Sequence, residues 1–141
     1  MEKRLFVYGT LRQGHLMHGL LRPLGRFLGR ASVKGRLYDL GGYPGLVLDD
    51  AAGWVHGELY RLTRPGQAFE VLDEYEGCLP AEVGKPEYRR VLCEVVTDRG
   101  CLSKAWMYEY VGSVAGFALL ADGNYPPPKT RRRLIQALAR R

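Results

Sequence analysis

Short runs of apolar and β-branched residues, each ended by turn-forming residues, recur through most of the chain. Residues 4–11 read RLFVYGTL and predict a buried strand that runs into a glycine turn. Similar runs predict further strands at residues 31–38, 46–48 and 53–62. Within the last of these, Gly57 indicates a bulge or a point where another backbone approaches closely. The first half of the chain is therefore rich in strands.

A hairpin is predicted further along the chain. Residues 88–97 and 103–110 both have strand character, and they flank the turn sequence Asp98-Arg99-Gly100. In the second strand Trp106, Tyr108 and Tyr110 alternate with other residues, so the three rings should share one face.

The sequence pattern predicts two helices, and a third, shorter helix has a less regular pattern. Residues 65–77 begin with proline, end with glycine and carry apolar side chains at helical spacing between them. These side chains are Ala68, Phe69, Val71, Leu72 and Tyr75. Residues 129–140 repeat the pattern after three prolines, while a short helix within 15–24 is weakened by a glycine and a proline.

This set of elements is typical of an α+β domain built on a curved, mostly antiparallel sheet or barrel. The length of 141 residues and the 46% hydrophobic content suit one core, and no linker divides the chain. We therefore expect a single domain over residues 1–141, in which 129–141 form a basic C-terminal helix.

Charge gives little support to a nucleic-acid partner. The net charge of +6 comes from residues 129–141, which hold six Lys and Arg and no acid, so the remainder is neutral. A solvated helix face explains this segment, and binding of nucleic acid through it remains the alternative. The sequence has no apolar stretch long enough to span a membrane and no secretory signal, so we expect a cytoplasmic protein with no membrane partner.

The three cysteines are an odd number without close pairing, which argues against a disulfide framework. Their spacing, far from the histidines, is also a poor match to zinc sites, so we predict no metal. Small buried apolar residues are the simplest interpretation.

Glu76 is the strongest candidate among the carboxylates for a catalytic role. It stands four residues after Leu72 and seven after Phe69, so it should point inward with the apolar stripe, whereas Glu70, Asp73 and Glu74 should be solvated. Burial and the negative end of the helix dipole would both raise the pKa of Glu76, which suits a group that takes and returns a proton. Alternatively, the last turn frays and Glu76 reaches water or pairs with Arg89 or Arg90.

The turn after the first strand is a second candidate. Gly9 has no side chain to prevent a positive φ or a close approach, so the successive amides of Tyr8, Gly9, Thr10 and Leu11 could converge on an anion or a carbonyl oxygen. An ordinary tight turn is the alternative.

Together these residues resemble one known family. In order along the chain stand Y-G-T-L-R at 8–12, G-Y-P at 42–44, G-E-L-Y at 57–60, L-D-E-Y-E-G at 72–77, Y-R-R at 88–90 and A-W-M-Y at 105–108. The set is similar to the γ-glutamylcyclotransferase-like (AIG2-like) family over about residues 4–112. The Y-G-T-L turn combined with L-D-x-x-E-G is its most specific part.

The resemblance implies a compact, mostly antiparallel β-barrel flanked by helices and a cofactor-independent enzyme. Its substrate would be a γ-glutamyl amine, from which the enzyme releases the amine as the glutamyl part closes into 5-oxoproline. By position, Glu76 would be the general base and acid, and residues 8–11 would hold the glutamyl group. Tyr43 and Tyr88 are further candidates for the pocket wall, although tyrosines at such positions are often core or rim residues.

Some parts of the sequence depart from the family pattern or leave it open. Met17 stands where the family often has asparagine before histidine, and residues 79–87 do not single out the departing amine. A non-catalytic barrel that senses a small metabolite, or binds nucleic acid through its last helix, is the alternative function. As partners we expect the small-molecule substrate and at most a weak homodimer.

Overall fold

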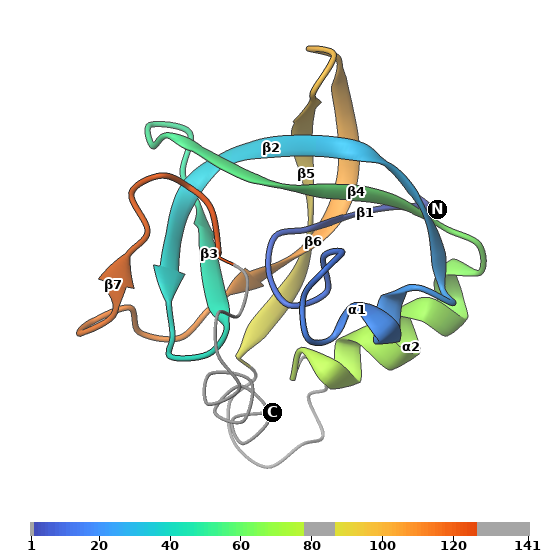
Figure 1. The fold of residues 1–141 in the computed structure, drawn as a ribbon, viewed down its shortest axis with the longest axis horizontal. Helices are drawn as coiled ribbons and strands as arrows, with labels where there is room; N and C mark the ends of the chain where they lie inside the picture. The colour runs from blue at the N-terminus through green and yellow to red at the C-terminus, as the bar shows by residue number, and fades with distance from the viewer. Residues whose placement is uncertain (1, 78–86, 127–141) are drawn as a thin grey trace.

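The computed structural model describes residues 2–77 and 87–126. Within these ranges the chain forms seven strands and two helices (Figure 1). The strands are β1 (Arg4–Val7), β2 (Gly25–Asp39), β3 (Pro44–Leu48), β4 (Trp54–Leu62), β5 (Tyr88–Thr97), β6 (Leu102–Tyr110) and β7 (Ala118–Leu119). The helices are α1 (His18–Leu21) and α2 (Pro65–Tyr75).

Five of the strands close into a barrel in the order β2, β4, β1, β6, β5, because β5 pairs back onto β2. All of these pairings are antiparallel except that of β1 with β6. The 15-residue strand β2 curves across the barrel, pairing with β4 and β5 and then extending to β3 (Figure 1). The prediction of an α+β fold built on a mostly antiparallel barrel with flanking helices is confirmed.

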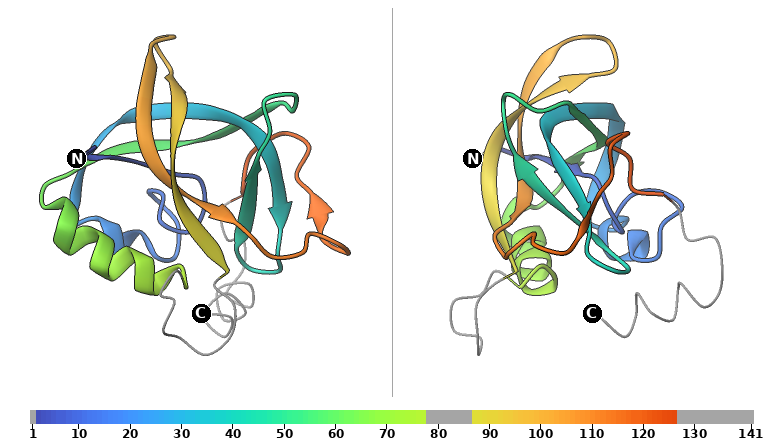
Figure 2. Two further views of the ribbon diagram at one scale, coloured as in Figure 1. Left: turned by 180° about the vertical axis from the view of Figure 1, so that it is seen from behind. Right: turned by 90° about the vertical axis from the view of Figure 1, so that its left-hand side faces the viewer.

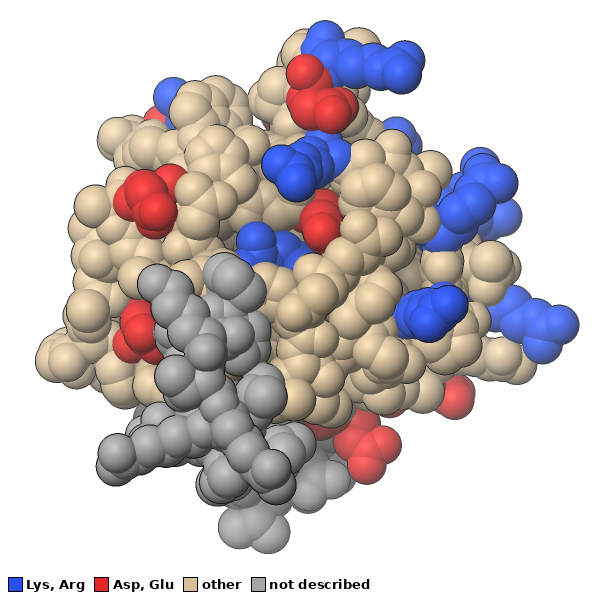
Figure 3. All heavy atoms as spheres, in the orientation of Figure 1, with Lys and Arg blue, Asp and Glu red and all other residues tan. Residues whose placement is uncertain are grey.

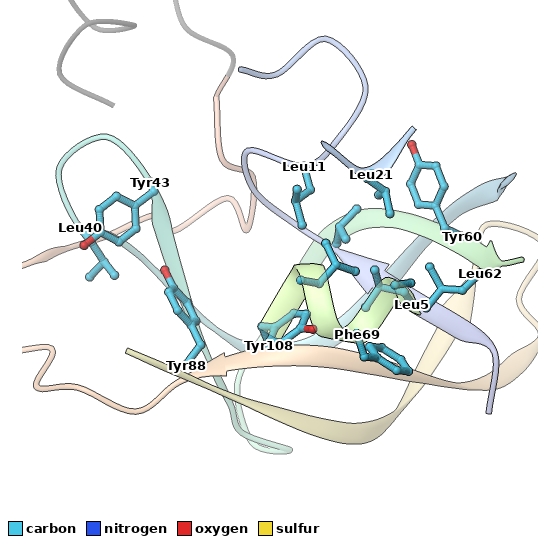
Figure 4. Packing of buried hydrophobic residues seen from close by; sticks show 13 residues of the cluster. Leu5, Leu11, Leu21, Leu40, Tyr43, Tyr60, Leu62, Phe69, Tyr88 and Tyr108 are labelled. Atoms are coloured by element: carbon cyan, nitrogen blue, oxygen red, sulfur yellow. The ribbon is translucent and has the colours of Figure 1, made fainter. Parts of the chain in front are cut away.

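From Leu5 onward, strand β1 is buried on both faces, which explains why its sequence is apolar there. Leu5 and Val7 belong to a cluster that also includes residues of α2, and Phe6 and Tyr8 belong to a second cluster with residues of β2, β4 and β6. Figure 4 shows the first cluster, in which Leu5 and Leu62 lie near Phe69 of α2. The end of β1 is therefore fixed by packing on both sides.

Helix α2 follows the predicted pattern closely. Pro65 occupies its first turn, and Gly77 adopts a φ of +72°, the left-handed conformation that commonly ends a helix. Ala68, Phe69 and Leu72 are buried as expected. Val71 is 39% exposed, so its place on the apolar stripe was wrong. The helix lies with α1 at one end of the barrel, while the tip of the β5–β6 hairpin projects at the other (Figures 1 and 2).

Some elements differ from the sequence expectation. Strand β2 begins at Gly25, well before the predicted residue 31, because pairing with β4 continues beyond a bulge between Phe27 and Gly29. Strand β7 was not predicted; it has only two exposed residues, which pair with the end of β2. The helix predicted at 129–140 lies outside the described residues, as does most of the connection before β5.

The sequence indicated that the cysteines are buried, and the structure shows that this is not true of all of them. Cys101 is exposed, Cys93 is partly buried, and Cys78 lies outside the described residues. Burial raises the pKa of the Cys93 thiol to about 12, so this thiol stays protonated at neutral pH.

On the face seen in Figure 3, basic and acidic side chains are interspersed, with a group of basic residues along one edge. Among the described residues, no helix is long and apolar enough to cross a membrane.

Gly57 gives a direct test of barrel packing. A Cβ at this position would lie 2.3 Å from the carbonyl oxygen of Val7, so Gly57 is a point of close backbone approach between β4 and β1. Because a backbone oxygen in the sheet cannot move aside, we expect Gly57→Ala to lower the free energy of unfolding by about 3 kcal/mol. Urea denaturation followed by circular dichroism measures this change.

Gly53→Ala is the matched control, since a Cβ at Gly53 would meet nothing within 4 Å. We expect this variant to stay within about 0.5 kcal/mol of the parent. Equal stabilities for the two variants would contradict the close approach of β4 to β1.

Candidate functional site

Barrel topology brings several chain segments together at one end. Because β1 and β6 are parallel, their C-terminal ends lie at the same edge, and β5, antiparallel to β6, begins there. Tyr8 therefore leaves β1 near Tyr108 of β6 and Tyr88 of β5. The hydroxyl of Tyr8 donates to the main-chain oxygen of Tyr108 at 2.6 Å, which holds these two strand ends together.

A small pocket lies at this end of the barrel. Its volume of about 30 Å³ is enough for one or two water molecules or a small chemical group. The residues that line it are Phe6, Val7, Tyr8, Gly9, Thr10, Leu11, Pro44, Glu76, Tyr88 and Tyr108. The two motifs singled out in the sequence, the turn at 8–11 and the acid at 76, thus meet at one cavity.

Glu76 points inward, as its helical spacing indicated. It is the C-terminal cap of α2, its N–H donates to the oxygen of Leu72 at 2.9 Å, and the residue is only 7% exposed. The alternative in which a frayed turn places Glu76 in water is therefore wrong. The arginines considered as its partners form other ion pairs: Arg90 with Asp73 at 3.0 Å, and Arg89 with Glu109 at 3.0 Å.

The turn after β1 is shaped by a contact that the sequence did not reveal. A Cβ on Gly9 would lie 2.6 Å from Cγ of Pro44, so only glycine fits beneath this proline. Gly9 does not adopt a positive φ, which removes the other reason suggested for a glycine here. The G-Y-P segment and the Y-G-T-L turn therefore pack directly against each other.

This turn presents main-chain donors. Among the residues that the structure describes, the N–H groups of Gly9, Thr10 and Leu11 donate to no acceptor. A main-chain N–H at a buried site normally finds a partner, and all three residues line the pocket. Such a set of donors is suited to an anion or to a carbonyl oxygen.

Arg12 supports the same turn from behind. Its Nε donates to the oxygen of Gly9 at 3.3 Å, and its Nη2 binds the oxygen of Tyr125 and lies 3.0 Å from Nε2 of His15. Burial lowers the pKa of Arg12. The guanidinium thus ties the turn to the segment after β7.

A hydroxyl pair connects the turn to α2. Oγ1 of Thr10 and Oη of Tyr75 lie 2.8 Å apart, and Tyr75 immediately precedes Glu76. Thr10 is 8% exposed, so this hydrogen bond is largely shielded from water. The position of the acid relative to the main-chain donors is fixed partly by this contact.

The two tyrosines suggested for the pocket wall have different positions. Tyr88 lines the pocket and donates from its hydroxyl to the oxygen of Pro44 at 2.6 Å. Tyr43 is buried beside β3 and donates to Oε1 of Glu87 at 2.8 Å, and it does not belong to the residues that line the pocket (Figure 4). It supports Pro44 as a chain neighbour rather than forming the wall.

The prediction that Asp73 is solvated was wrong, because its carboxylate is bound by two other side chains. Its carboxylate accepts from Arg90 Nε at 3.0 Å, from Arg90 Nη2 at 3.3 Å and from the Tyr108 hydroxyl at 2.6 Å. Glu70 and Glu74 are exposed as expected. Sequence reasoning also missed Tyr108 and Pro44 as pocket residues, although the shared aromatic face of β6 was a signal for the former.

Within residues 2–77 and 87–126, no group of three or more His, Cys, Asp and Glu side chains is arranged to hold a metal ion. The described residues that line the pocket carry one carboxylate, main-chain amides, and threonine and tyrosine hydroxyls. These groups bind, orient and exchange protons.

Comparison with known proteins agrees with this architecture. Residues 5–127 match the family model described as gamma-glutamyl cyclotransferase, AIG2-like. The chain belongs to this γ-glutamylcyclotransferase family, which confirms the resemblance seen in the motifs.

Individual relatives support the same assignment. The chain is 38% identical over 126 residues to the gamma-glutamylcyclotransferase family protein ytfP of Citrobacter rodentium, covering 86% of this chain and 94% of that one. It is 35% identical over 108 residues to the gamma-L-glutamyl-butirosin B gamma-glutamyl cyclotransferase of Niallia circulans. That match covers 75% of this chain but 65% of the relative, so about a third of the relative has no counterpart in it.

Solved structures share the fold. The solution structure of ytfP from Escherichia coli superposes with a TM-score of 0.60 at 35% identity and covers 86% of this chain and 95% of that one. YkqA from Bacillus subtilis gives a TM-score of 0.67 at 28% identity; the match covers 89% of this chain but only 40% of YkqA.

The contact of Pro44 with Gly9 generates a test of how the turn is held. We expect Gly9→Ala to reduce the free energy of unfolding by about 2 kcal/mol, because the new methyl group must displace the proline ring. The double variant Gly9→Ala/Pro44→Ala should recover at least half of that loss, since it removes the clashing ring. Gly19→Ala, where a Cβ meets nothing within 4 Å, is the control and should not be destabilised. Absence of recovery in the double variant would show that the two residues do not compete for the same space.

Proposed function

We propose that this protein releases an amine from a γ-glutamyl amine while the glutamyl part closes into 5-oxoproline, with Glu76 as the proton shuttle. The observation that carries the proposal is the meeting, at one pocket, of a buried carboxylate and main-chain N–H groups that find no acceptor among residues 2–77 and 87–126. Membership of the γ-glutamylcyclotransferase family gives the reaction class in which these groups have a use.

The chemistry requires a single general base that later acts as an acid. Glu76 takes a proton from the substrate's α-ammonium, and the freed amine attacks the γ-carbonyl carbon to form the five-membered ring. The bond from this carbon to the departing nitrogen then breaks as the proton held by Glu76 passes to that nitrogen. The ring nitrogen loses its second proton, which the departing amine takes up to leave as an ammonium. No water is consumed, and the products are 5-oxoproline and the free amine.

The turn after β1 supplies the second requirement. During ring closure the carbonyl oxygen acquires negative charge, and donors already fixed in space stabilise that charge without reorganising. The amides of Gly9, Thr10 and Leu11 are suited to this role because Pro44 and Arg12 hold their backbone in place. Tyr8 and Tyr88 form walls that restrict the glutamyl part to a pose near ring closure.

The size of the pocket bears on the substrate. A cavity of about 30 Å³ holds only a small chemical group, so we propose that a γ-glutamyl amine enters it in part and that its leaving amine extends out of the cavity. The relative from Niallia circulans is named for action on γ-L-glutamyl-butirosin B, which agrees with a site that accepts a bulky group beyond the glutamyl part. We propose a small-molecule γ-glutamyl amine as the partner of this chain.

The direct test uses purified protein with a panel of γ-glutamyl amines and measures 5-oxoproline by chromatography. We expect turnover of at least one substrate, and a fall in kcat of about 10²-fold or more in Glu76→Gln, because loss of a general acid–base group typically costs that much. Circular dichroism should show that the variant stays folded.

Glu74→Gln is the matched control, since it removes a carboxylate from the same turn of α2 at an exposed position. It should retain the parent's activity. Saturable binding of γ-glutamyl compounds without 5-oxoproline release would indicate a sensing module instead. Equal turnover by the parent and Glu76→Gln would show that another group moves the proton.

A further inference from the structure

The contacts of Asp73 form a connected set of side chains between α2 and the β5–β6 hairpin. Its carboxylate receives both nitrogens of Arg90, Nε at 3.0 Å and Nη2 at 3.3 Å, and also the Tyr108 hydroxyl at 2.6 Å. The Arg90 guanidinium lies 4.0 Å from the ring centre of Phe69 and 4.9 Å from that of Trp106. One acid thus joins helix α2 to both strands of the hairpin.

This ion pair differs from an ordinary surface pair. The side chains of Arg90 and Asp73 are 26% and 21% exposed, and the arginine is confined by two aromatic rings that are themselves in edge contact at 6.0 Å. A two-pronged, partly buried pair fixes geometry, whereas exposed pairs contribute little. The ion pair therefore fixes the position of the C-terminal half of α2 relative to the β5–β6 hairpin.

The same contacts lead directly to the pocket. Asp73 precedes Glu76 by three residues, so both lie on neighbouring parts of one helix face. Tyr108, the hydroxyl partner of Asp73, is itself a pocket residue, and its main-chain oxygen receives the Tyr8 hydroxyl. A shift of Asp73 would move the last turn of α2 and the Tyr108 ring together.

We propose that Asp73 is a positioning residue, which through Arg90 and Tyr108 sets the depth at which Glu76 enters the pocket. This inference rests on the proposed function for its kinetic consequence. Its structural consequence, the burial of the Glu76 carboxyl, is independent of that function. The Thr10–Tyr75 hydrogen bond holds the other side of the same turn, so Asp73 acts as one of two supports.

The test compares Asp73→Leu, Asp73→Asn and the control Glu74→Gln with the parent. Asparagine still accepts a hydrogen bond from Tyr108 but loses the ion pair, whereas leucine loses both. We expect kcat for 5-oxoproline release to fall about 30-fold in Asp73→Leu and several-fold in Asp73→Asn, with KM within about threefold, since small misplacements of a reacting group have effects of this order.

A second readout follows the Glu76 carboxyl itself by ¹³C NMR as a function of pH. In Asp73→Leu its titration midpoint should move by about half a pH unit or more toward that of an exposed glutamate, because burial of a carboxyl favours the protonated form. The midpoint should be unchanged in Glu74→Gln and intermediate in Asp73→Asn. Melting temperatures are recorded for all variants.

The outcomes separate the two proposals. If the parent releases no 5-oxoproline from any substrate, the proposed function fails, and the Glu76 midpoint alone decides the role of Asp73. If folded Asp73→Leu keeps both the parent's kcat and its midpoint, the positioning role is overturned. The role is also overturned if kcat falls only in proportion to the melting temperature across the variants while the Glu76 titration midpoint is unchanged. That pattern indicates a purely structural residue.

Discussion

The packing of the last turn of α2 against the turn after β1 is the interaction on which the site depends. Glu76 gains its burial from this contact, and the Thr10–Tyr75 hydrogen bond crosses it. Strand β1 is buried on both faces, so the turn that follows it has little freedom to move. The helix is likewise fixed by Phe69 and Leu72 in the core. Two rigid elements thus bring a carboxylate and main-chain donors to one cavity.

Pro44 closes this arrangement from a third side. It excludes any side chain at position 9 and receives the Tyr88 hydroxyl on its main-chain oxygen. The turn, the start of β3 and the start of β5 therefore support one another. A site built from strand ends and a helix end in this way holds its groups in place before a ligand arrives, which is what electrostatic catalysis requires.

Much of this could be predicted from sequence because the signals are local. Helical spacing correctly predicted that Glu76 points inward, and apolar runs correctly predicted the positions of most strands. The role of Gly9 could not be derived in this way, since Pro44 lies in another strand. Asp73 was misjudged for the same reason: its partner Arg90 is 17 residues away, beyond the end of the helix. Pairing across the barrel likewise determined the early start of β2 and the existence of β7.

If the proposed function holds, one small molecule touches the turn and the acid at the same time. Titration of the protein with 5-oxoproline, followed by NMR, tests it most directly by recording the amide signals of Gly9, Thr10 and Leu11 together with the Glu76 carboxyl. We expect these signals to shift along one saturation curve with a single Kd. Saturable binding that leaves these amides or the Glu76 carboxyl unmoved would contradict the account.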